Sequence, residues 1–217
     1  MKKIMMIAAM MVATLSASAQ NEVGQITLKP TVGLNIATMS KFDSKKTRPG
    51  VIAGLEAEYG VAEKFGLTAG LFYSMQGVKQ EANGSTTVEG LPYSAGVKAT
   101  YKLDYLNIPI LAQYYLIKGL AVKAGVQLGF NVSKKGEIEF TESFAGETEK
   151  ETFKGKLEDS VKSFQFAIPV GLSYEYQNFV LDARYNIFLT KAFKEGYMVS
   201  DSRHSVFSVT LGYKFAL

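Results

Sequence analysis

Eight charged side chains have the strongest capacity for chemistry in this 217-residue chain, and they recur on the polar side of alternating segments. They are Lys29, Glu56, Glu58, Lys123, Glu175, Asp182, Arg184 and Lys214. Four acids and four bases facing one space could line a polar path or a binding lumen. They could also neutralise one another in a sealed interior, because buried charges must be paired. A narrow interior favours the sealed network, and we predict a lumen charge network from these residues.

The single histidine, His204, lies in "SDSRHS" beside Asp201, Ser202 and Ser205. A serine, a histidine and an acid within hydrogen-bond reach would suit acyl transfer at the rim of a membrane protein. These neighbours are close only in sequence, and no nucleophile motif accompanies them, so we predict no catalytic residue. The chain has no cysteine and one histidine, and we therefore predict no metal or cofactor site.

Alternation of apolar and polar residues predicts the elements that carry these side chains. In "SVFSVTLGYKFAL", residues 205–217, large apolar residues occupy every second position, as in a half-buried strand. The same period recurs near residues 26–40, 50–61, 66–77, 106–116, 120–133, 163–176 and 179–191. The sequence therefore predicts eight strands.

The run "YLNIPILAQYYLIKGLAV", residues 105–122, is the most apolar part of the chain after its N-terminus. It alternates, turns at Lys118-Gly119 and contains Pro109, which argues against an uninterrupted helix. We interpret it as two strands that meet at a tight turn. Pro30, Pro109 and Pro169 are expected at bulges or bends, because proline removes a donor from the ladder.

The predicted connections alternate in length. Residues 61–65, 117–119 and 177–178 are short, whereas residues 40–49, 77–101, 134–162 and 191–203 are long and polar. This order predicts an all-β, eight-stranded, antiparallel up-and-down transmembrane barrel with its short turns in the periplasm.

A soluble lipocalin-like barrel is the alternative fold, with its apolar side chains inside. The interior of an eight-stranded barrel is narrow. It accommodates the glycines and paired charges of the polar face more easily than all the large side chains of the apolar face. Aromatic residues also gather toward both strand ends, as in the girdles of membrane barrels. Both observations favour the transmembrane barrel.

The N-terminus carries an export pattern. "MKK" is positive, "IMMIAAMMVATL" is apolar and "SASA" supplies small residues, which together predict a signal peptide over residues 1–19. The apolar stretch is short for an N-terminal membrane anchor. We expect cleavage near Ala19, a barrel domain over residues 20–217 and a location in a Gram-negative-type outer membrane.

Two long loops are candidates for contact with partners. The loop 134–162 mixes both charge signs with Phe140, Phe144 and Phe153, and its alternation predicts a hairpin above the membrane, either partner-binding or simply solvated. The loop 77–101 is rich in glycine, serine and threonine and is expected to be more mobile. Expected partners are outer-membrane lipid and proteins that contact these loops. The basic residues are scattered despite a pI near 9.0, so no nucleic-acid partner is predicted.

The segment "YLNIPILAQYYL" resembles the Tyr-Leu-x-Ile-Pro motif of the PorT-like outer-membrane β-barrel family. "GLTAGLFYSMQG", "IPVGLSYEY" and "LDARYNIFLT" fall where that family has its third, sixth and seventh strands. The resemblance covers most of the chain and implies the barrel fold and the outer-membrane location, and its motifs carry no catalytic residues. We predict a non-enzymatic barrel with a structural or interaction role, accessory to secretion or envelope assembly. A narrow-lumen transport or small-ligand-binding barrel is the alternative, because fold alone does not transfer a role.

Overall fold

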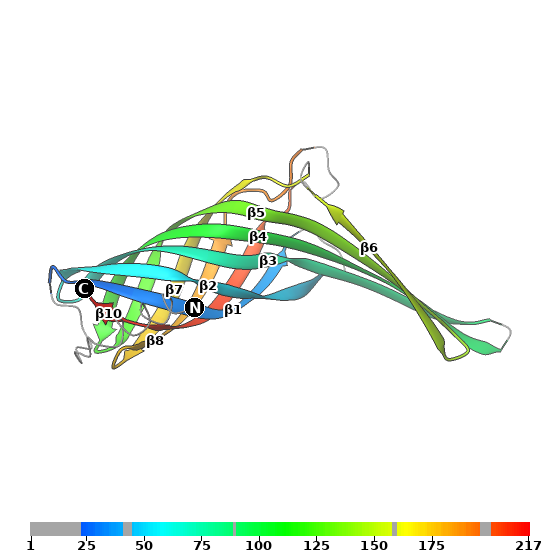
Figure 1. Ribbon diagram of the computed structural model, residues 1–217, viewed down its shortest axis with the longest axis horizontal. Coiled ribbons are helices and arrows are strands. Elements are labelled where there is room, and N and C mark those ends of the chain that lie inside the picture. The colour runs from blue at the N-terminus through cyan, green and yellow to red at the C-terminus, as the bar shows by residue number, and fades with distance from the viewer. Residues whose placement is uncertain (1–22, 41–44, 89, 158–159, 196–200) are drawn as a thin grey trace, which may run out of the picture.

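The computed structural model describes residues 23–40, 45–88, 90–157, 160–195 and 201–217, and these form one antiparallel sheet of ten strands (Figure 1). The strands are β1 Ile26–Met39, β2 Lys45–Ala62, β3 Phe65–Val88, β4 Leu91–Ile117, β5 Leu120–Phe144, β6 Glu147–Lys156, β7 Phe164–Tyr176, β8 Phe179–Phe188, β9 His204–Tyr213 and β10 Phe215–Ala216. The predicted signal peptide lies outside the described residues. Within them, no helix is long and apolar enough to cross a membrane.

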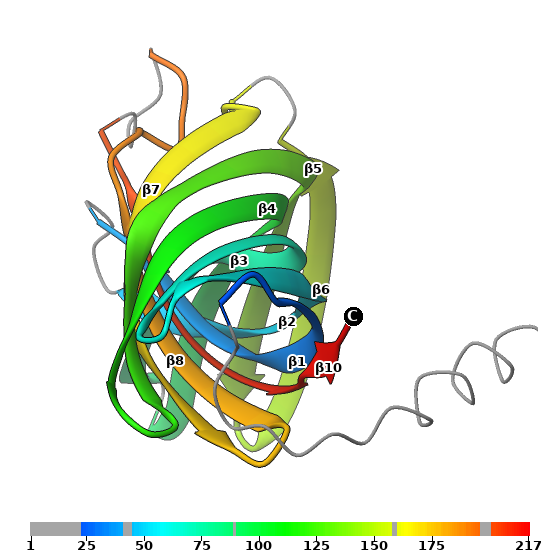
Figure 2. The same cartoon turned by 90° about the vertical axis from the view of Figure 1, so that its left-hand side faces the viewer.

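The sheet closes on itself through its first and last strands. Val32 of β1 faces Ala53 of β2 on one side and Leu211 of β9 on the other, and β10 continues that second pairing (Figure 2). β6 pairs with β5 outside the closed wall. Counting β9 and β10 as one strand, the wall has eight strands, each paired with its neighbours, so the predicted up-and-down antiparallel barrel is confirmed.

The apolar side chains of the wall point outward. Leu34 on β1 is 66% exposed, whereas its neighbour Asn35 is fully buried, and the same alternation runs along the other strands. Phe130 and Phe164 form an exposed aromatic pair 5.6 Å apart toward one end, and Tyr59 is among the exposed aromatics toward the short-turn end. A lipocalin-like barrel would have these apolar side chains inside, so that alternative fold is wrong. Apolar side chains on the outside are expected of a barrel wall that faces lipid.

The three prolines predicted at bulges or bends, Pro30, Pro109 and Pro169, lie at interruptions of single ladders rather than at bulges. β3 and β4 pair Ala69 with Ile110 and Phe72 with Asn107, so the register is the same on both sides of Pro109. Pro30 and Pro169 lie in similar interruptions, and the first of these separates β9 from β10. The predicted bulges are therefore wrong, because a missing N–H removes a hydrogen bond without inserting a residue.

Two hairpins extend the sheet beyond the barrel as a four-stranded arm, which we define as the described residues of 79–102 and 135–156 (Figure 1, right). The β5–β6 hairpin was predicted and is confirmed. The segment 77–101, which was expected to be mobile, is instead regular hairpin, with Gln80 facing Ala99 and Val88 facing Leu91. Its polar and small residues pair in register because β5 continues beside β4 along the hairpin.

Close approach of β4 and β5 generates a first prediction. A Cβ added at Gly125 would lie 2.1 Å from the carbonyl oxygen of Ile110, whereas one at Gly84 in the arm would meet no atom within 4 Å. We expect Gly125→Ala to lower the free energy of unfolding by about 1–3 kcal/mol or to block folding, and Gly84→Ala to change it little. Urea titration of the gel-mobility shift in detergent measures both. Equal midpoints for the two variants would contradict the close approach.

Candidate functional site: the charged interior and the arm

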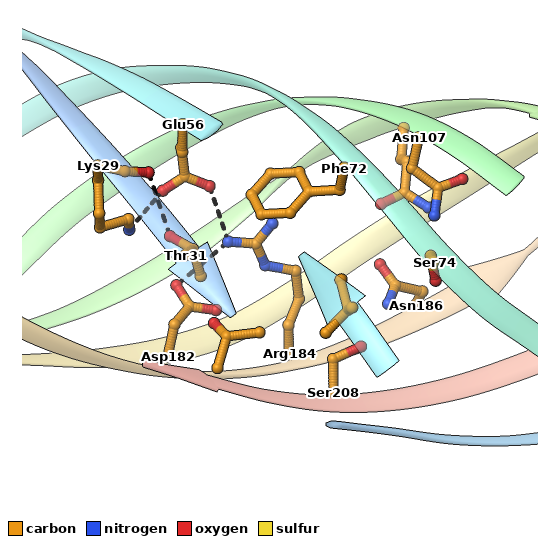
Figure 3. A pocket seen from close by; sticks show the side chains of 13 residues that line it. Lys29, Thr31, Glu56, Phe72, Ser74, Asn107, Asp182, Arg184, Asn186 and Ser208 are labelled. Carbon is orange, nitrogen blue, oxygen red and sulfur yellow. Dashed lines mark hydrogen bonds and ion pairs between the residues drawn. The ribbon is translucent and has the colours of Figure 1, made fainter. Parts of the chain in front are cut away.

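The centre of the barrel is organised around one carboxylate. Glu56 on β2 is 1% exposed and accepts hydrogen bonds from Lys29 Nζ at 2.7 Å and Arg184 Nη2 at 3.0 Å (Figure 3). It also accepts one from Lys123 Nζ at 3.1 Å. These three cations come from β1, β5 and β8. Alternation places each of them on the inner side of its strand, so one acid joins four strands across the lumen.

A second acid completes this central cluster. Asp182 on β8 lies 2.8 Å from Lys123 Nζ and 3.2 Å from Arg184 Nη2. The Arg184 guanidinium also stands over the ring of Phe72, 5.9 Å from its centroid, a cation–π geometry. The central cluster, Lys29, Glu56, Lys123, Asp182 and Arg184, thus combines two acids with three bases.

A separate cluster lies nearer the short turns. Lys214 Nζ contacts Glu175 at 2.6 Å and Glu58 at 3.1 Å, and Tyr115 donates its hydroxyl to Glu58 at 2.9 Å. Gln113 Nε2 also donates to Glu58, at 3.1 Å. This turn-side cluster, Glu58, Glu175 and Lys214, has two acids and one base, which offsets the excess positive charge of the central cluster.

All eight sequence-predicted residues thus lie inside the barrel, but in two clusters rather than one. Gln113 and Tyr115, which both donate to Glu58, are not among the predicted residues. The proximity of both to Glu58 depends on register across three strands, β2, β3 and β4, and no local pattern signals it. Phe72 was missed in the same way.

A layer of amides and hydroxyls fills the next level of the interior. Asn35 Nδ2 donates to Ser74 Oγ at 2.8 Å, and Ser208 Oγ donates to Asn35 Oδ1 at 2.7 Å. Between this layer and the central cluster lies a cavity of about 20 Å³, which also contacts Asn107 and Asn186 (Figure 3). That volume holds about one water molecule.

Apolar side chains close the mouth on the side of the long connections, which we call the outer mouth. Met39, Val78 and Leu103 of the wall are fully buried against Val161 and Phe193, which belong to the connections after β6 and β8. Val161 and Phe193 also pair as an isolated β-bridge, so the two connections meet over the lumen. We call this cluster the cap. With the two charged clusters below it, the interior is packed from end to end.

His204 belongs to the packed wall beneath the cap. Its Nε2 lies 3.4 Å from the Tyr105 hydroxyl, and its ring packs between Tyr105 and Phe188. Asp201 pairs with Lys191 at 2.6 Å, near the surface. This packing is typical of a core histidine. Among the described residues, no group of three or more potential metal ligands occurs.

The arm carries apolar residues on one face, which we call its inner face because Val78 and Leu103 continue it into the lumen. Residues opposite one another in an antiparallel pair share a face. The register therefore places on the inner face Ala82, Tyr93, Ala95, Val97, Ala99, Tyr101, Ile138, Phe140, Phe144 and Phe153. It adds four carboxylates toward the tip and the β6 edge: Glu142, Glu147, Glu149 and Glu151.

A groove of about 290 Å³ opens where the inner face meets the cap. Tyr101, Ile138, Phe153 and Leu157 line it, and Tyr101 packs edge-on against Phe193 of the cap at 6.1 Å. The groove is large enough for one apolar side chain of a partner.

The charge network generates a second prediction. Glu56→Gln leaves three buried cations near one remaining carboxylate, so we expect a loss of about 3–5 kcal/mol in the free energy of unfolding. Glu149→Gln, on the exposed arm, makes the same chemical change and should cost less than about 0.5 kcal/mol. Urea midpoints from circular dichroism in detergent compare the two. A Glu56→Gln midpoint equal to that of Glu149→Gln would contradict a role for the network in stability.

Comparison with known proteins places this architecture. A family model described as "Outer membrane protein beta-barrel domain" matches residues 18–194. No curated protein sequence matches the chain significantly.

Among solved structures, Ail of Yersinia pestis, in complex with the heparin analogue sucrose octasulfate, is 14% identical, with 89% of this chain and 100% of that chain covered and a TM-score of 0.40. Neisserial surface protein A is 14% identical, covering 92% and 99%, with a TM-score of 0.43. OprG of Pseudomonas aeruginosa is 14% identical, covering 91% and 98%, with a TM-score of 0.42.

The family match spans most of the chain, and the closed barrel with its lipid-facing wall agrees with it. The chain therefore belongs to the outer membrane protein beta-barrel domain family.

Proposed function

We propose that the protein is a non-enzymatic interaction protein of the outer membrane, in which a sealed barrel holds the arm and the inner face of the arm binds a protein partner. The observation that carries this proposal is the apolar groove on a sheet anchored in the barrel wall. Loops and edges held by a rigid scaffold are common sites of recognition.

The interior supports a scaffold better than a conduit. Its charges are paired in two clusters, its cavity measures about 20 Å³ and apolar residues cap the outer mouth. Transport or small-ligand binding in the lumen, the alternative role, would need these contacts to open. The packing of the His204 ring against Tyr105 and Phe188 supports a non-enzymatic role.

The chemistry of the inner face indicates its partner. Val97, Ile138, Phe140 and Phe153 are each about half exposed, and the nearby carboxylates are exposed as well. An apolar patch of this kind on a protein surface marks an interaction site. The complementary partner is a protein segment with an apolar anchor side chain flanked by lysine or arginine.

The resemblance of "YLNIPILAQYYL" to PorT-like proteins supports a narrower role, as an accessory to secretion or envelope assembly. In that role the arm would hold an exported protein near the cell surface. Export of the chain itself would depend on the signal peptide over residues 1–19, with cleavage near Ala19.

A third prediction follows from the packed interior. We expect no stable single-channel steps from the purified protein in planar lipid bilayers, because the two charged clusters and the cap leave no continuous path. Protein folding in the bilayer is checked by protease protection of the wall. Stable steps from the wild-type protein that disappear in Lys29→Ala would support the transport role instead.

A fourth prediction tests the inner face. A photo-crosslinking amino acid that replaces Phe153 lies on the inner face, whereas one that replaces the adjacent Lys154 lies on the opposite face. We expect irradiation of intact cells to give a discrete protein adduct from position 153 but not from position 154. Charge reversal at Glu149 and Glu151 should weaken that adduct, because the partner carries basic residues. Equal adducts from positions 153 and 154, or none from either, would contradict the proposal.

A further inference from the structure

The second face of the arm, which we call its outer face, is rich in lysine rather than in apolar residues and carboxylates. The register places on this outer face seven lysines and three glutamates: Lys79, Lys98, Lys102, Lys135, Lys150, Lys154, Lys156, Glu81, Glu137 and Glu139. The outer face continues the lipid-facing side of the barrel wall, because β3 and β4 keep their alternation as they leave it. The arm therefore separates an acidic, apolar face from a basic face.

Three of these lysines occupy one row across the sheet. Lys102 on β4 faces Lys135 on β5, which faces Lys156 on β6. Like charges directly opposite one another destabilise a sheet, so anionic groups beside this row stabilise it. Glu137 is one such group: it accepts a hydrogen bond from Lys102 at 2.5 Å, and that bond holds the pKa of the Glu137 carboxyl below its usual range.

The row borders a surface hollow of about 500 Å³. Its charged lining consists of the three lysines of the row with Lys154, against the single carboxylate of Glu137. The hollow therefore keeps a net positive charge after its internal ion pair is formed. A second hollow beside it is lined by Lys135 and Lys156 together with Asn131 and Ser133 of the emerging strand β5. Lys134 also borders this hollow, but its ammonium group donates to the Val161 carbonyl and the Ser163 hydroxyl.

The row lies just beyond the headgroup region of a membrane, within reach of lysine side chains. Phe130 on β5 belongs to the exposed aromatic pair, and Lys135 follows five residues later. A register shift lies between them, so the rise corresponds to the four residues from Leu106 to Lys102 on β4. At about 3.3 Å per residue and a tilt of about 40°, Lys135 lies roughly 10 Å above that pair. Headgroups extend about 5–8 Å beyond the hydrocarbon, and a lysine side chain can reach back across the remaining distance.

We propose that the lysine row Lys102, Lys135 and Lys156 binds the phosphate groups of anionic lipids in the outer leaflet. The position favours lipid over a soluble anion, because the row continues the wall that lipid already contacts. Phosphate oxygens accept charge-assisted hydrogen bonds from lysine ammonium groups and relieve the repulsion within the row. This site is independent of the inner face, and it orients the arm relative to the membrane surface.

The test uses the full-length mature protein in neutral detergent and lipid A, a glycolipid with two phosphates, with binding measured by native mass spectrometry. Lys135→Gln/Lys156→Gln should weaken binding about thirtyfold, since each lysine near an anionic surface contributes about fivefold. The matched control Lys98→Gln/Lys150→Gln removes the same charge farther along the arm and should change affinity less than about threefold. Lys135→Arg/Lys156→Arg should retain binding.

Further ligands distinguish the source of the phosphate. Lipid A without its phosphates should bind the wild-type protein as weakly as lipid A binds the glutamine double variant. Equal losses in Lys135→Gln/Lys156→Gln and Lys98→Gln/Lys150→Gln would overturn the assignment. So would equal binding of the dephosphorylated lipid, loss of binding in the arginine variant, or displacement of lipid A by inorganic phosphate or heparin at equal concentration.

Discussion

The structure depends on the pairing of opposite charges inside the barrel, because the lumen is too narrow for water to solvate them. An eight-stranded barrel just accommodates its inward side chains, so ionised groups inside it must find partners among one another. Four acids and four bases do so in the described interior, and Glu56 alone binds cations from three other strands. The network therefore joins strands that are distant in sequence, and the same contacts that hold the wall together fill its lumen.

Filling the lumen moves the candidate functional surface to the arm. The cap closes the outer mouth and also supports the base of the arm, since Tyr101 and Leu157 pack against it. The arm continues three strands of the wall, so it projects as a sheet rather than as separate loops (Figure 1). The inner face of the arm continues the lumen-facing side of these strands, and its outer face continues their lipid-facing side. This continuity explains how two faces of one small sheet can suit different ligands.

Much of this architecture could be predicted from alternation alone. Period 2 identified eight strands, and the volume argument placed Lys29 and Glu56 inside. Which charges meet could not be predicted, because Glu56 and Arg184 are brought together by barrel closure and register, which leave no local signal. The hairpin within 77–101 was missed because its glycine, serine and threonine residues are typical of loops, whereas pairing with β5 holds them extended. Pro109 was expected at a bulge or bend for a related reason: a lost donor and an inserted residue look alike in sequence.

We conclude that the barrel folds and fills its own lumen without the arm, and that the arm is a separate extension that carries the functional surfaces. Replacing residues 82–97 and 138–153 with two-residue turns tests it directly, because Glu81 faces Lys98 and Glu137 faces Lys154 in the register that would remain. The account predicts that the shortened protein folds in lipid with the urea midpoint of the full-length protein. Failure of the shortened protein to fold, or a much lower midpoint, would show that the arm is part of the barrel's stability and would contradict the claim.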